Sequence, residues 1–254
     1  MANDLMNVKS GNPGLNDRTF NGLPRPELAS ERMTLQGTIN KSFLALIVLM
    51  AAALYPWSQF MDSGNPAVVA VPMIVGLVGG LIAALIISFR PTTAPYLVLP
   101  YAALEGLVLG GLSAILERKY PGIAIQATAL TFGVLAALLI AYKARLIQAT
   151  ARFKAIVIGG TMAIALFYLV TMVLGLFHVA TPFMNDASPL SIGISLVIVG
   201  FASLNLVLDF DLIETGVNQG APRYMEWYGA FGLLVTLVWL YMEILRLLSK
   251  IRQR

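Results

Sequence analysis

The fold of this protein is decided by one stretch of its sequence, Ala67–Phe89, which reads AVVAVPMIVGLVGGLIAALIISF. It runs for 23 residues without a charged side chain. An α-helix rises about 1.5 Å per residue, so about 20 apolar residues are enough to cross the ~30 Å hydrocarbon core of a bilayer. The stretch therefore predicts a transmembrane helix.

One run before this stretch and five after it have the same character, and each is bounded by charge, proline or glycine. They cover roughly residues 42–60, 95–116, 123–142, 155–177, 190–213 and 227–248. Prolines, which interrupt helices, stand between the runs or at their edges, at Pro66, Pro91, Pro95, Pro121, Pro182, Pro189 and Pro222. We therefore predict an all-α integral membrane protein with about seven transmembrane helices in a bundle.

Composition agrees with a membrane protein and narrows its chemistry. Of the 254 residues, 58% are hydrophobic and 12% are charged, where a soluble domain carries about 25% charged residues. The chain has no cysteine and a single histidine, His178, which excludes disulfide scaffolds, thiol nucleophiles and zinc sites built from His and Cys. We expect no cofactor, and any metal would have to bind oxygen ligands.

The formal charge of +4 is expected to set membrane orientation rather than to bind nucleic acid, because the basic residues lie between the apolar runs. Residues 1–41 form a polar stretch with five basic residues, and the connection 143–154 carries four. Positive segments stay in the cytoplasm. We therefore expect a flexible cytoplasmic arm over residues 1–41, whose end, 33–40, forms a short surface helix, and a membrane domain over 42–254.

The last apolar run conflicts with this orientation. Seven spans place the tail outside, although it carries four basic residues (Arg246, Lys250, Arg252 and Arg254). Six full spans, or a seventh segment that re-enters the membrane, are the alternatives that the sequence leaves open.

Two pairs of glycines have the spacing that allows helices to approach closely. Gly76 and Gly80 form one GxxxG pair, and Gly106 and Gly110 form another. In membranes such pairs mark helix–helix interfaces, because small residues let the backbones meet. We expect these faces to pack against neighbouring helices.

Carboxylates at membrane depth are the candidate functional residues, because a charge there is costly and usually faces a partner or a pathway. Glu105 lies near the bilayer centre with no charged neighbour within two helical turns. Asp209 and Asp211 lie near the cytoplasmic end of the sixth run and point ~200° apart, so only one can face the interior squarely. Glu243 has Arg246 three residues later, and a surface ion pair explains it without a function.

Residue patterns typical of catalysis are missing. A serine nucleophile needs a base, and the single histidine has no adjacent carboxylate. An intramembrane aspartyl protease needs two aspartates on different helices, whereas both intramembrane aspartates lie in one run. No glycine-rich phosphate loop is present. We expect that the protein is not an enzyme.

The sixth and seventh runs resemble the Bax inhibitor-1 family, also called the YccA-like or transmembrane Bax inhibitor motif family. The resemblance lies in Phe210–Glu214 (FDLIE) and, after a short loop, in Tyr228–Leu237 (YGAFGLLVTL). The long amino-terminal arm is similar to that of a bacterial branch. This implies a multi-pass protein of the bacterial plasma (inner) membrane with its amino terminus in the cytoplasm.

The resemblance also implies a last helix wrapped by the other six, and a pH-sensitive calcium leak. In the family, two aspartates on the last two helices share a proton and gate the pore. The first corresponds to Asp211, or to Asp209 if the register slips by two residues. The second corresponds to Thr236, which is a departure from the family pattern.

Glu105 is the candidate to replace the missing aspartate, because it lies at a depth similar to that of Thr236. This substitution requires the third and sixth spans to be neighbours. Under this hypothesis the Glu105 carboxyl is protonated or hydrogen-bonded and faces Thr236 and the sixth helix.

Two functions remain open from the sequence. The first is an ion leak gated by Asp211, Asp209 and Glu105, with the lipid bilayer and calcium as partners. The second is a non-conducting protein that binds other membrane proteins or a protease, in which the carboxylates only hold helices together.

Overall fold

The computed structural model describes residues 31–177 and 186–254, so His178 and residues 1–30 of the arm lie outside the described residues. Within these ranges the protein consists of long α-helices and one 3₁₀ turn. Seven helices are long and apolar enough to cross a membrane. The prediction of an all-α bundle with about seven spans is confirmed.

The helices follow the predicted runs closely, as their bounds show: α1 (Leu35–Ser63), α2 (Ala67–Phe89), η3 (Pro91–Thr93), α3 (Ala94–Lys119), α4 (Ile123–Lys143), α5 (Ala151–Leu176), α7 (Pro189–Asn218) and α8 (Met225–Arg252). The main difference is at the start of α1. Of the residues 33–40 expected to form a short surface helix leading into the span, those from Leu35 onward are the first turns of α1 itself. Thr34 caps this helix by accepting a hydrogen bond from Gly37 N–H.

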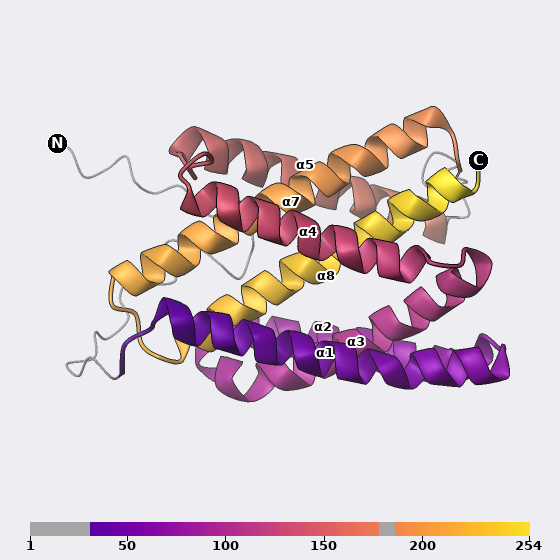
Figure 1. The fold of residues 1–254 in the computed structure, drawn as a ribbon, viewed down its shortest axis with the longest axis horizontal. Coiled ribbons are helices and arrows are strands. Elements are labelled where there is room, and N and C mark those ends of the chain that lie inside the picture. The colour runs from indigo at the N-terminus through magenta and orange to yellow at the C-terminus, as the bar shows by residue number, and fades with distance from the viewer. Residues whose placement is uncertain (1–30, 178–185) are drawn as a thin grey trace.

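Helix α8 runs through the middle of the bundle, between α1 and α3 on one side and α4 and α7 on the other (Figure 1). It is the most deeply buried of the seven spans. Helix α2 packs on α3 and α1, while α5 packs on α7. The central position that the family resemblance implied for the last helix is therefore observed, with α2 and α5 as the outer members.

The two ends of α8 lie at opposite ends of the bundle. Met33 N–H, just before α1, donates to the carbonyl of Ala221 in the α7–α8 connection at 2.7 Å. At the other end, Arg252 donates to the Pro121 carbonyl at 2.6 Å and to Gln126 at 2.9 Å, where α3 turns into α4. The last helix is a full-length span, which favours seven crossings over a re-entrant segment.

Both glycine pairs lie at helix interfaces, as predicted. A methyl group added at Gly76 would lie 2.5 Å from the backbone oxygen of Leu104 in α3, and Gly80 faces the side chain of Glu105. Gly106 and Gly110 face the backbone of α1. Small residues thus set the close approach of α3 to both α1 and α2, which fixes the rotation of α3 in the bundle.

Candidate functional site

The two aspartates of α7 have different surroundings. Asp209 is 2% exposed, whereas Asp211 is half-buried. Leu206 and Ile213 lie about one turn on either side of Asp209, and both belong to the apolar core that α7 forms with α8. The expectation that only one aspartate faces the interior is confirmed, and that residue is Asp209.

Asp211 lies on the other side of α7, against α5 and α4. The Lys154 ammonium of α5 lies 2.6 Å from an Asp211 carboxylate oxygen. One turn further along α7, the Tyr142 hydroxyl of α4 donates to Glu214 at 2.6 Å. An ion pair and a hydrogen bond thus connect α7 to both neighbours near the connection between α4 and α5.

A second polar contact joins α5 and α7 deeper in the bundle. The Asn205 side-chain amide, 6% exposed, donates to the Thr161 hydroxyl at 2.8 Å and to the Phe201 carbonyl at 2.8 Å. Buried amides need such partners because an unsatisfied one is costly in an apolar surrounding. The Thr161–Asn205 contact therefore fixes the facing positions of the two helices.

A third set of polar residues joins α5 to α8. The Tyr168 hydroxyl donates to Glu243 at 2.7 Å, and Arg246 pairs with the same carboxylate at 3.0 Å. The pairing of Glu243 with Arg246 was predicted, but its location at the surface was wrong, because Glu243 is only 2% exposed. The sequence spacing could not show that α5 covers this carboxylate.

The last polar contact lies near the carboxyl-terminal end of α8. Lys250, 4% exposed, donates from its ammonium to the Ser195 hydroxyl of α7 at 2.9 Å. The Ser191 carbonyl lies 3.5 Å from the same nitrogen. A lysine that the sequence placed in the tail is therefore enclosed between two helices.

These four contacts form one line through the bundle, which we call the polar seam: Lys154–Asp211, Thr161–Asn205, Tyr168–Glu243–Arg246 and Lys250–Ser195. The α5 members are seven residues apart, as are Glu243 and Lys250 in α8. Seven residues make about two helical turns, so these side chains share one face. From the first turn of α5 to the last turns of α8 the seam covers roughly 30 Å, the thickness of the hydrocarbon core.

Sequence reasoning missed most of the seam, although a signal was present. Lys154, Thr161 and Tyr168 repeat at seven residues in one run, and Thr236, Glu243 and Lys250 repeat at seven in another. A polar residue at every second turn of an apolar helix indicates a polar face. Only carboxylates were treated as candidates, so the hydroxyl and lysine partners were not identified.

Glu105 lies apart from the seam. It is half-buried in α3, interacts with the hydroxyl of Tyr101 on its own helix, and faces Gly80 of α2. Among the described residues, α3 packs mainly on α1, α2 and α8, and α7 is not among its main neighbours. The expected position of Glu105 beside the sixth span is therefore wrong, because α8 lies between α3 and α7.

The comparisons with known proteins agree with this architecture. The profile of the family described as Bax inhibitor 1 like matches residues 8–253. The chain belongs to the Bax inhibitor 1-like family. No curated protein and no solved structure matches it significantly.

Thr236, which the resemblance in the sequence aligned with the second of two aspartates, is 4% exposed in α8. Thr236 lies two turns before Glu243 on the same face of α8. The position that carries the second family aspartate is therefore inside the bundle but uncharged. Asp209, rather than Asp211, is the buried aspartate of α7.

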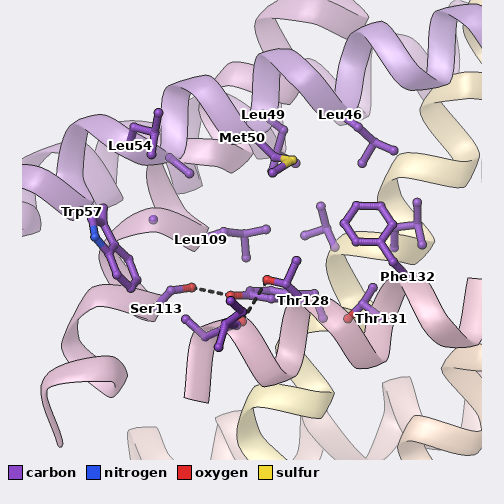
Figure 2. Close-up of a pocket in the computed structure, with 17 residues that line it drawn as sticks. Leu46, Leu49, Met50, Leu54, Trp57, Leu109, Ser113, Thr128, Thr131 and Phe132 are labelled. Atoms are coloured by element: carbon purple, nitrogen blue, oxygen red, sulfur yellow. Dashed lines mark hydrogen bonds between the residues drawn. The ribbon is translucent and has the colours of Figure 1, made fainter. Parts of the chain in front are cut away.

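A separate apolar cavity lies between α1 and α4, and residues of α3 and α8 also line it (Figure 2). Its volume is about 340 Å³, and most of its lining side chains are apolar, among them Leu49, Leu109 and Phe132. Its polar groups are few: Ser113 hydrogen-bonds to Tyr241 at 2.8 Å, and Tyr241 also interacts with Thr128. This lining suits a hydrocarbon chain and offers no path for an ion.

Proposed function

We propose that this member of the Bax inhibitor 1-like family is a pH-sensitive cation leak, with calcium as the expected ion, and that the polar seam is its path. The supporting observation is that four separate polar contacts join α5, α7 and α8, spaced about 10 Å apart along the helices. Ionisable residues at that depth are rare and usually mark ion pathways or proton relays.

In this proposal the Lys154–Asp211 ion pair is the lock at the end of the seam near the α4–α5 connection. When this ion pair separates, the attraction that holds Lys154 of α5 to Asp211 of α7 is lost, and α5 loosens from α7. Tyr142 and Glu214 face the same region from α4 and α7. An acid-activated leak would then open at this end of the seam.

Asp209 has a different role in the same proposal. It is the buried carboxylate of α7, one turn after Asn205 of the seam, and in this proposal it attracts a cation that has entered the seam. The resemblance aligns Thr236 with the second aspartate of the family pattern. Asp209 therefore has no second aspartate at that position with which to share a proton. The pH response then depends on the ion pair of Asp211 rather than on an aspartate dyad.

The test is calcium flux in proteoliposomes loaded with a calcium indicator, measured over a pH series that brackets neutrality. Asp211→Asn should leak at neutral pH and respond little to acid, while Asp209→Asn should reduce the flux at every pH. Asp62→Asn is the matched control, because Asp62 is exposed at the end of α1 and lies outside the seam. It should behave as the wild type.

Two other outcomes of the flux measurement would each contradict part of the proposal. If Asp211→Asn and Asp209→Asn keep the wild-type pH profile, neither aspartate is the sensor, and the proposed gating by the seam is refuted. If the folded wild type carries no flux at any pH, the leak is refuted. The non-conducting protein that binds other membrane proteins then replaces it.

The proposal includes a location. We infer the bacterial inner membrane with the amino terminus in the cytoplasm, supported by the basic residues that flank α1, α4 and α5 at one end of the bundle. The lock at Asp211 is then at the cytoplasmic side.

A further inference from the structure

A second pocket lies where the start of α1 meets the α7–α8 connection. Its volume is about 490 Å³. Three cationic side chains line it (Arg32, Lys41 and Arg223), together with one carboxylate, Glu226. The pocket is therefore basic, in contrast to the apolar cavity between α1 and α4.

Two segments distant in the sequence build this pocket. Arg32 pairs with Pro222 as an isolated antiparallel bridge. Beside it, Arg223 N–H donates to the Glu31 carbonyl at 2.7 Å, as Met33 N–H does to Ala221. These backbone bonds place Arg32 and Arg223 next to each other. The basic pair thus follows from the fold rather than from a run of charge in the sequence.

The single carboxylate of the pocket is already engaged by protein groups. Glu226 is 2% exposed, accepts hydrogen bonds from the Thr34 backbone N–H at 2.9 Å and hydroxyl at 2.8 Å, and forms an ion pair with Lys41. It pairs with Lys41, so two further cationic side chains, Arg32 and Arg223, line the pocket. Both arginines are exposed at its mouth, so an anion can reach them from solution.

An apolar surface adjoins this basic pocket on the side of the bilayer. Leu44 lines the pocket and is 43% exposed. Phe43, next to Leu44, and Ile47, about one turn further along α1, are 63% and 62% exposed. A ligand with an anionic headgroup and a hydrocarbon chain fits both the basic pocket and the adjoining apolar surface, whereas a soluble anion would contact only the basic pocket.

We propose that this pocket binds the phosphate headgroup of an anionic phospholipid, with an acyl chain along Leu44 and the exposed face of α1. Basic pockets beside transmembrane helices are suited to such headgroups. Because the pocket joins the start of α1 to the α7–α8 connection, the bound lipid also stabilises that junction. This site is separate from the polar seam and does not depend on the proposed leak.

The test measures lipid binding to the full chain in mixed micelles, by native mass spectrometry and by the shift in melting temperature. Phosphatidylglycerol is the anionic probe and phosphatidylcholine the neutral one. We expect preferential retention of phosphatidylglycerol. Arg32→Gln or Arg223→Gln should each weaken binding about fivefold, the contribution of one cation near a membrane surface, and the loss should shrink at high salt.

Arg90→Gln is the matched control, because it removes one exposed charge at the same end of the bundle, in the α2–α3 connection. It should leave the affinity for phosphatidylglycerol unchanged. An equal loss in the control would show non-specific surface attraction and would overturn the site.

Three further results would also contradict the proposal. One is equal binding of the two lipids by the wild type. Another is stabilisation by inorganic phosphate as large as that by phosphatidylglycerol, which would identify a site for a free anion. The third is a lower melting temperature of Arg223→Gln in phosphatidylcholine alone with unchanged lipid affinity, which would assign this arginine a structural role.

Discussion

Replacing Gly110 with alanine should force helices α1 and α3 apart. A methyl group at Gly110 would lie 2.7 Å from the Cα of Ala53 and still closer to its carbonyl oxygen. Ordinary contacts of a Cβ are 3.4–4 Å, so α1 must retreat by about 1 Å. The obstacle is backbone, which cannot rotate away as a side chain can.

The magnitude follows from two opposing effects. Overfilling a packed interface typically costs about 1–3 kcal/mol, whereas alanine is about 1 kcal/mol better than glycine inside a helix. The net loss is therefore ~0–2 kcal/mol, which corresponds to a decrease in melting temperature of up to about 8 °C for a domain of this size. Ala53 and Gly110 also line the apolar cavity, so that cavity should widen.

The assay is thermal unfolding in detergent, with Gly133→Ala in α4 and Gly159→Ala in α5 as controls. No atom lies within 4 Å of the methyl group that either control would add, so each should be neutral or slightly stabilising. If Gly110→Ala melts at the same temperature as these controls, the close contact of α1 with α3 is not what holds them together, and the reasoning fails.

Three further predictions concern orientation and the buried polar contacts. A cysteine at Ala149, between α4 and α5, should resist an impermeant thiol reagent in intact cells and react after permeabilisation; labelling of intact cells would invert the orientation. Tyr168→Phe removes the hydroxyl that donates to buried Glu243 and should cost ~1–3 kcal/mol of stability in thermal unfolding, whereas Tyr55→Phe, at an exposed tyrosine, should cost nothing measurable. Glu226→Gln keeps the shape of the side chain but loses the charge that pairs with Lys41 beside it, so faster proteolysis at the start of α1 is expected, and an unchanged digestion pattern would contradict this.

The sequence alone determined the number of spans and, within a few residues, where most of them lie. The length of an apolar run is a local property, and the thickness of the hydrocarbon core converts it directly into a spanning helix. The glycine pairs also predicted helix–helix interfaces from the sequence, because a missing side chain permits close backbone contact with any neighbouring helix. Gly110 and Gly76 therefore identified interfaces before their partners were known.

The pairing of polar side chains was decided only by the tertiary structure. Whether Asp209 or Asp211 is buried depends on the rotation of α7, and that rotation is set by the apolar packing of whole helices. The burial of Glu243 depends on where α5 lies, and Glu105 faces α2 because α8 separates α3 from α7. A helix alone fixes only which of its residues share a face; the neighbour that each face meets is chosen by packing in three dimensions.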